Sequence, residues 1–207
     1  GAFQAPLRGD RGMALVGLDG RWLRVNRALC AIIGYSEEEL LQKKFQDITH
    51  SDDLEADLGH VRDLVDGRQR SSQMEKRYFH HDGHVVWINL TASLVRDGAG
   101  RPAHFVSQIE DITARKHAEE ALRKSQQMFQ RLFESSPDAV VLVGRDSRIV
   151  RANARVEAMF GWAGDALLGQ PLEILLPERF HARHDAHLAV YFQNPHARSM
   201  GAGLSPA

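Results

Sequence analysis

Three histidines near the C-terminal end of the sequence follow one another at three-residue spacing. His181, His184 and His187 lie in the stretch RFHARHDAHLAVYF. Neutral imidazole is a common metal ligand, so three histidines at this spacing are a candidate metal site. A structural role on a helix, buried or at the surface, is the alternative. Three histidines on one short helix do not easily converge on a tetrahedral ion without a fourth ligand from elsewhere.

No other group of residues has the pattern of a catalytic site. The sequence contains no GxxxxGK[ST] phosphate loop, no HExxH, no CxxC and no GxSxG. The acids of HSDD, residues 50–53, suit the start of a helix better than a metal site, because carboxylates stabilise helix N-termini. His80, His81 and His84 flank a turn and are expected to face water. We therefore expect no catalysis from these residues.

The composition is that of a globular protein without a strong charge bias. The 207 residues carry a net charge of −1, and 43% are hydrophobic. A nucleic-acid partner would need a basic stripe, which is absent from the sequence. No apolar run approaches the roughly 20 residues of a membrane span. Cys30 is the only cysteine, which fits a reducing cytoplasm. We expect a cytoplasmic segment, and an upstream membrane anchor stays open.

The sequence contains one pattern twice. Residues 15–35 and 142–162 align without a gap at an offset of 127. We infer two copies of one domain, because chance rarely gives so many ungapped matches. The identical pairs are Leu15/Leu142, Val16/Val143, Gly17/Gly144, Asp19/Asp146, Arg21/Arg148, Arg24/Arg151, Asn26/Asn153 and Gly34/Gly161.

The first copy predicts two strands, several short helices and then three strands. Asp19-Gly20 is a hairpin turn, and Asn26 can cap the helix that follows it. Gly34 ends that helix, and Ser36 with Glu39 forms a capping box. The strand-like runs are residues 71–79, 85–97 and 103–113. This order predicts an α+β domain with an antiparallel sheet.

Three stretches of the first copy resemble the PAS domain with its C-terminal PAC segment. They are GRWLRVNRALCAIIGYSEEEL, RYFHHDGHVVWINL and HFVSQIEDITARK, in the family's order. The resemblance implies two PAS folds in tandem, each a five-stranded antiparallel sheet with flanking helices. We predict a first domain at 1–113, a linker helix at 114–133 and a second domain at 134–207. The second copy is expected to lack most of its closing strands.

The predicted linker has an apolar stripe at heptad spacing. One interpretation is a solvated helix with one apolar side. The other, favoured by its similarity to the helix that follows PAS sensors, is a parallel dimer helix that carries a signal. The stripe residues are Ala118, Leu122, Ser125, Phe129 and Leu132. Leu122, Phe129 and Leu132 are the predicted dimer contacts.

The histidine helix of the second copy resembles that of the haem-binding PAS domains of bacterial oxygen-sensor kinases. The match makes His184, followed by Asp185, the candidate axial ligand of haem iron. Two positions depart from that family. Leu204 stands where a strand arginine holds bound gas, and Val190 stands where a helix arginine holds the propionates. Arg198 is a substitute for the propionate contact.

The resemblance implies a sensory input module of a bacterial histidine kinase or diguanylate cyclase. Its output domain is expected outside this chain, and its signal is a small ligand, a gas or a redox state. A homodimer is the expected assembly, without nucleic acid or membrane contact. No cofactor motif is evident in the first domain, where Trp87 and Asn89 are the predicted pocket residues. The alternative is a cofactor-free dimerisation and relay module, and an enzyme is a third hypothesis that no catalytic motif supports.

Overall fold

The structure of the protein is a computed structural model, and residues 11–181 are the part of the chain that it describes. The chain divides into two compact units, residues 1–122 and 123–207, and each is described by itself. Within residues 11–181, no helix combines the length and the apolar character needed to cross a bilayer.

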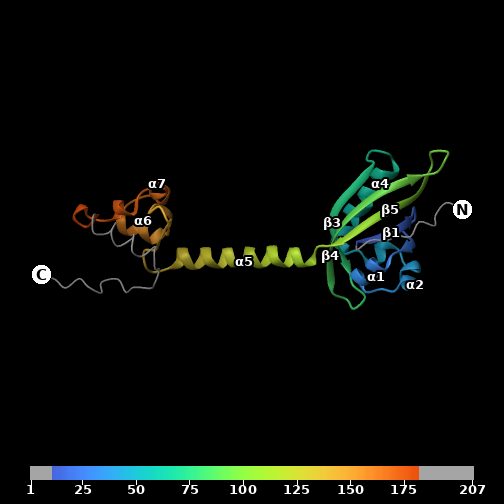
Figure 1. Ribbon diagram of the computed structural model, residues 1–207, viewed down its shortest axis with the longest axis horizontal. Coiled ribbons are helices and arrows are strands. Elements are labelled where there is room, and N and C mark those ends of the chain that lie inside the picture. The colour runs from blue at the N-terminus through green and yellow to red at the C-terminus, as the bar shows by residue number, and fades with distance from the viewer. Residues whose placement is uncertain (1–10, 182–207) are drawn as a thin grey trace. The chain divides into compact units, whose positions relative to one another are not determined.

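The first unit contains a five-stranded antiparallel sheet (Figure 1). The spatial order of the strands is β2-β1-β5-β4-β3, so β1, the first strand of this sheet, pairs with β5, its last. This confirms the predicted α+β fold class. The strands are β1 (Gly12–Gly17), β2 (Trp22–Val25), β3 (Ser71–Phe79), β4 (Val85–Arg96) and β5 (Pro102–Asp111).

Four helices connect β2 to β3 and pack on one face of the sheet, here called the inner face (Figure 1). They are α1 (Arg27–Ile33), α2 (Glu37–Leu41), α3 (Phe45–Ile48) and α4 (Ser51–Val65). Gly34 ends α1 with φ 76°, and Ser36 and Glu39 form the predicted capping box of α2. The cap of α4 is His50, whose side chain accepts from the amide of Asp52.

The core of this unit lies between the helices and the inner face. Leu29 and Ile33 of α1 and Ile88 and Ile109 of the sheet are fully buried. Each such side chain contributes about 1.5–3 kcal/mol through burial. Along β4, Val86, Ile88 and Leu90 alternate with less buried residues, because successive side chains of a strand point to opposite faces.

The junction between the sheet and the next helix is held by side-chain hydrogen bonds. The Thr113 amide donates to the Asp111 carboxylate at 2.8 Å, and the amide of Trp87 donates to the Thr113 hydroxyl at 3.0 Å. Helix α5 (Thr113–Ser135) starts at this point. The sheet thus fixes where α5 begins and in which direction its first turn leaves.

The second unit repeats the start of the first at the level of single hydrogen bonds. Asn26 Oδ1 accepts from Met13 and Leu29 amides, and Asn153 Oδ1 accepts from those of Val140 and Val156, each 127 residues later. The structure therefore supports the internal repeat. Its elements are β6 (Val141–Val143), β7 (Ile149–Ala152), α6 (Ala154–Phe160), α7 (Gly164–Leu167) and the 3-10 helices η1 (Leu172–Leu175) and η2 (Glu178–Phe180).

Candidate functional site

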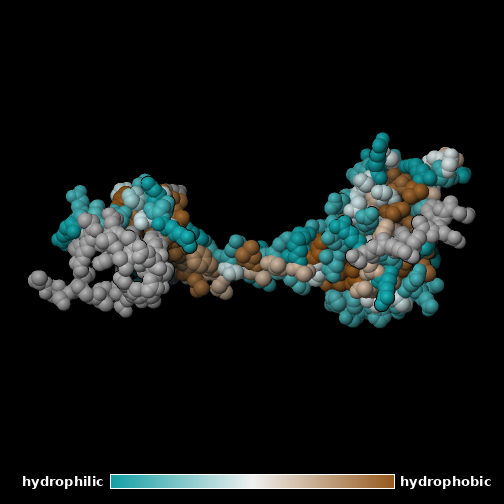
Figure 2. All heavy atoms as spheres, viewed as in Figure 1, coloured by the Kyte–Doolittle hydropathy of each residue, from teal (hydrophilic) through white to brown (hydrophobic). Residues whose placement is uncertain are grey.

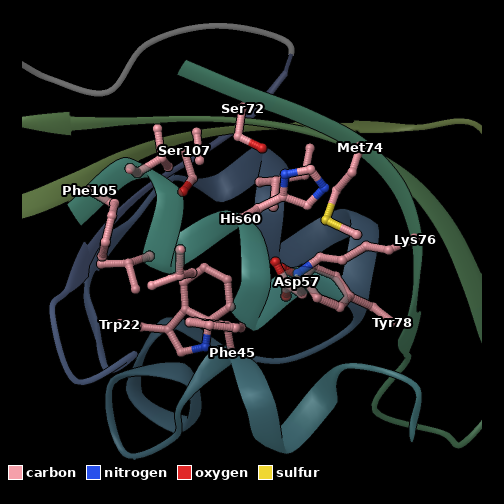
Figure 3. A pocket seen from close by; sticks show the side chains of 15 residues that line it. Trp22, Phe45, Asp57, His60, Ser72, Met74, Lys76, Tyr78, Phe105 and Ser107 are labelled. Carbon is pink, nitrogen blue, oxygen red and sulfur yellow. The ribbon is translucent and has the colours of Figure 1, made fainter. Parts of the chain in front are cut away.

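A pocket lies between α4 and the inner face of the sheet in the first unit (Figure 3). Its wall is mostly apolar, with a few polar groups. The space that a water-sized molecule can occupy is about 30 Å³. One water needs about 10–15 Å³, so a larger ligand would have to displace side chains. The lining residues are Val16, Trp22, Phe45, Asp57, His60, Val61, Leu64, Ser72, Met74, Lys76, Tyr78, Leu90, Ala92, Phe105 and Ser107.

A buried ion pair crosses the pocket from helix to sheet. Lys76 of β3 donates to the carboxylate of Asp57 on α4, and the two side chains are 1% and 3% exposed. The Lys76 ammonium also lies 4.5 Å from the centroid of the Tyr78 ring and 5.1 Å from that of Phe45. Burial lowers the pKa of Lys76, and the charge of Asp57 opposes that shift. Figure 3 shows Lys76 and Asp57 pointing toward each other.

Two buried polar atoms of pocket-lining residues have no hydrogen-bond partner in the described part of the chain. They are Trp22 Nε1 and His60 Nδ1. Leaving such an atom unsatisfied costs about 1–3 kcal/mol, so a bound molecule or water that satisfied it would be favoured. Ser72 and Ser107 add hydroxyl groups from β3 and β5. The pocket therefore suits a small, mostly apolar molecule with a few polar atoms.

Trp87 and Asn89, the predicted pocket residues, are absent from this lining. They are two residues apart on β4, so both point to the outer face of the sheet, away from helices α1–α4. Asn89 accepts a hydrogen bond from Gln73, and the Trp87 ring has the Arg77 guanidinium 5.3 Å and the Lys116 ammonium 5.1 Å from its centroid. The pocket takes Leu90 and Ala92 from β4 instead, because they have the opposite parity along the strand.

The first turn of α5 is attached to the outer face through Glu75. Its carboxylate accepts from Arg115 at 2.5 Å and from Lys116 at 2.6 Å. These hydrogen bonds, first from Lys116 and then from Arg115, lower the pKa of Glu75. The Lys116 ammonium lies 5.1 Å from the centroid of the Trp87 ring. Glu75 is the neighbour of Lys76 in β3, so this strand contacts the pocket and the connector helix at adjacent residues.

Strand β3 has a second ion pair with α4. The Arg77 guanidinium donates to Asp53 at 2.7 and 2.9 Å, and the Arg77 amide donates to the same carboxylate at 2.8 Å. The side-chain hydrogen bond from Arg77 is the main cause that lowers the pKa of Asp53. Predicted only as an acidic helix start, Asp53 therefore fixes α4 against the strand that carries Glu75 and Lys76.

The predicted dimer contacts lie on α5, where apolar side chains are exposed (Figure 2). Leu122 is 60%, Phe129 44% and Leu132 64% exposed. Phe129 also stacks on Phe133, with ring centroids 5.7 Å apart. Exposed leucines at heptad spacing are what an unpaired coiled-coil helix presents.

The predicted haem residues His184, Arg198 and Leu204 lie outside the described residues, as does His187. His181 is described, at the C-terminal side of η2. Its Nε2 lies 2.9 Å from the carbonyl oxygen of Leu176. That nitrogen is therefore occupied by the backbone of its own unit.

Comparisons with known proteins match both units to one fold. Two family models, both described as the PAS fold, match residues 23–109 and 127–204. Among curated proteins, the chain is 46% identical over 121 residues to the probable diguanylate cyclase DgcE of Escherichia coli (strain K12). It is 32% identical over 117 residues to the sensor protein FixL of Bradyrhizobium diazoefficiens.

The matched regions are small parts of those proteins. The alignments cover 58% and 56% of this chain, but only 11% of the cyclase and 23% of the sensor protein. Among solved structures, a sensory box histidine kinase/response regulator from Burkholderia thailandensis E264 matches with a TM-score of 0.49 and 26% identity. That match covers 59% of this chain and 92% of the other.

Proposed function

This chain carries two PAS domains, and we propose that they form a sensory input module of a larger bacterial signalling protein. Support comes from the relatives, which are a probable diguanylate cyclase and sensor proteins of which this chain spans a minor part. The catalytic output, a cyclase or a histidine kinase, would lie outside these residues. The module detects and relays, without chemistry of its own.

The input in this proposal is a small molecule in the pocket of the first domain. The two unsatisfied atoms, Trp22 Nε1 and His60 Nδ1, are the groups that a ligand with an acceptor and a further polar atom would satisfy. The space in the pocket that a water-sized molecule can occupy is only about 30 Å³. A ligand must therefore move lining side chains, and Met74 of β3 is the most adaptable of them because its side chain is unbranched.

The proposed relay runs through β3. The observation that carries the proposal is that adjacent residues of β3 contact the pocket and α5. A ligand that displaces Met74 or weakens the Lys76–Asp57 pair moves β3 from its inner side. Glu75 would transmit that shift to α5 because it holds the first turn of α5 from the outer side. The ligand then needs only to bind one arrangement of β3 and α5 better than the other.

The output side of the relay is a parallel homodimer through α5. Leu122, Phe129 and Leu132 supply its contacts, and pairing would remove their exposed apolar surface from water. A change at the start of α5 would then alter the packing of two helices together. The alternative module, without any ligand, would use the same dimer for relay alone.

Haem at His184 is a second input in this proposal, in the second domain. The PAS model that matches residues 127–204 includes this histidine. The imidazole of His184 would hold the haem iron, and the haem would supply the gas-binding chemistry. Arg198 is the residue proposed to contact a propionate.

The ligand proposal is tested by native mass spectrometry and thermal shift of the purified chain against a panel of bacterial metabolites. We expect a bound small molecule or a thermal shift, abolished in Ser107→Phe, which fills the pocket from β5. Gln108→Phe, on the outer face of the same strand, is the matched control and keeps binding. Binding that survives in folded Ser107→Phe, or no binding by the wild-type chain, would favour the ligand-free relay.

A further inference from the structure

The turn between β3 and β4 gathers three groups that can ligate a metal. In the sequence FHHDGH, residues 79–84, the side chains of His80, Asp82 and His84 alternate with those of other residues. Among the described residues, 11–181, these three form the group whose candidate ligand atoms lie within 4.8 Å of one another. The group follows the pocket-lining residue Tyr78 along the chain, but none of its three residues lines the pocket.

The carboxylate of Asp82 lies beside the Nδ1 atoms of both rings. Its Oδ1 is 2.9 Å from His80 Nδ1 and 2.5 Å from His84 Nδ1. The rings are stacked, with centroids 4.3 Å apart and planes at 23°. Two imidazole nitrogens and one carboxylate oxygen therefore converge on one volume at the tip of a hairpin.

The backbone holds these side chains in place. The amides of His80 and Gly83 donate at 2.8 Å to the carbonyl oxygens of His84 and His80, and Gly83 adopts φ 95°. The His80 ring packs directly against Gly34, at the end of α1. His80 is consequently only 21% exposed, although we predicted that it faces water. The tight turn and the packing of His80 thus hold the candidate metal ligands in place before an ion binds.

The neighbouring His81 has a different environment. Its Nε2 lies 3.4 Å from the Glu39 carboxylate, and its ring meets that of Tyr35 edge to face. The adjacent histidine is therefore engaged elsewhere and serves as an internal control for the group.

We propose that His80, Asp82 and His84 bind a divalent transition-metal ion of the Zn²⁺, Ni²⁺ or Cu²⁺ class. Imidazole and carboxylate together suit these ions, whereas Mg²⁺ and Ca²⁺ prefer oxygen ligands alone. Zinc takes His nitrogen and Asp oxygen at about 2.0–2.2 Å. The ion would stand between Asp82 Oδ1 and the two Nδ1 atoms. Ligand atoms of a tetrahedral zinc ion lie roughly 3.3–3.6 Å apart, so the 2.9 Å and 2.5 Å contacts must both widen when the ion binds. Water would complete a tetrahedral site.

Such an ion would link the hairpin of the two pocket strands to the end of α1. β3 and β4 both meet at this turn, and His80 contacts Gly34. Metal loading would therefore restrict the motion of β3, the strand on which the proposed relay depends. The site itself stands on its own geometry, so metal binding can be tested independently of any pocket ligand.

The test is isothermal titration calorimetry of the untagged chain with ZnCl₂. Measurements use a background with His181, His184 and His187 changed to alanine, which removes the other histidine cluster. We expect one zinc ion per chain, with affinity reduced at least about 10- to 100-fold in His84→Ala, since even partners of metal ligands contribute that much. Asp82→Asn preserves the size of the side chain and should reduce the zinc affinity by a similar factor.

His81→Ala on the same turn should bind zinc like its parent, and MgCl₂ and CaCl₂ should give no binding heat. X-ray absorption of the zinc complex should show two imidazole ligands. The proposal is overturned if the background variant binds no zinc, or if His84→Ala and Asp82→Asn bind it as tightly as His81→Ala. Circular dichroism of each variant verifies that the fold is intact.

Discussion

Glu75 and Lys76 are consecutive residues of β3 whose side chains form ion pairs on opposite faces of one sheet. Lys76 pairs with Asp57 of α4 at the pocket, and Glu75 pairs with Arg115 and Lys116 of α5. A strand alternates its side chains between two faces, so a movement of β3 affects both pairs at once. This relationship is the structural basis of the proposed relay from the pocket to the connector helix α5.

Removing only one partner of the Lys76–Asp57 pair should strongly destabilise the fold. Asp57→Asn leaves a buried ammonium without its counter-charge, and we expect a loss of about 3–5 kcal/mol in the free energy of unfolding. The double variant Asp57→Leu/Lys76→Met replaces the pair with apolar side chains and should be neutral or more stable, by up to about 4 kcal/mol. Urea denaturation measures both.

The matched control is Asp63→Asn on the same helix. Asp63 pairs with Arg68 at the surface, where their side chains are 30% and 65% exposed. Exposed pairs contribute about 0–1 kcal/mol. If Asp57→Asn lost no more stability than Asp63→Asn, the buried charge pair would not have the role assigned to it.

Ionisation of Asp53 should make the free energy of unfolding depend on pH in the acidic range. Its hydrogen bonds with Arg77 lower its pKa in the folded state, so its contribution is complete above the unfolded pKa of about 3.9. That contribution is lost as the pH falls through the lower, folded-state pKa. Asp53→Asn should therefore cost about 1–3 kcal/mol at pH 7, and the difference from wild type should shrink below about pH 4.

Denaturation curves at a series of pH values between neutrality and acid provide the comparison. Asp52→Asn is the control, because Asp52 is 67% exposed and lies 3.4 Å from the same guanidinium. It should change stability little at any pH. A difference between Asp53→Asn and wild type that stayed constant into acid would mean that Asp53 is not the titrating group.

Much of the fold was predictable because its signals are local. Asn26, Gly34 and the Ser36–Glu39 box each act on backbone groups within a few residues, and all three occupy their predicted places. The 127-residue repeat is confirmed even in the hydrogen bonds of Asn26 and Asn153.

The pocket was not predictable in the same way. Lys76 lies between Glu75 and Arg77, and three consecutive charged residues do not show which of them is buried. Its partner Asp57 is 19 residues away on a helix, and no local pattern signals their contact. Strand parity does carry information: Trp87 and Asn89 had to share a face, and Met74, Lys76 and Tyr78 share the other face of the sheet.

The dimer prediction concerns the apolar stripe of α5. Leu122→Asp places a charge where two helices would meet. We therefore expect sedimentation equilibrium to show a dimer dissociation constant at least tenfold higher, a change of about 1.4 kcal/mol or more in the free energy of association. Gln127→Asp, also exposed on α5 but off the stripe, should leave association unchanged. An intact dimer in Leu122→Asp, or a monomeric wild type, would refute the connector interpretation.

The haem prediction is tested by the absorption spectrum of the chain expressed with haem supplied. An intense Soret band should be present in wild type and lost in His184→Ala, because the axial ligand is gone. His187→Ala, three residues away, should retain the band. A colourless wild-type protein, or a Soret band that persists without His184, would contradict haem binding through His184.

The relay through β3 is tested most directly by hydrogen exchange at the start of α5, residues 113–118. Asp57→Asn, on the pocket side, should accelerate exchange there, and so should Glu75→Gln on the outer side. Leu29→Ala controls for general destabilisation, since it costs about 2–5 kcal/mol in the same core without touching β3 pairs. Faster exchange in Asp57→Asn than in Leu29→Ala is the predicted result. Equal exchange in the two would contradict coupling between the pocket and the connector helix.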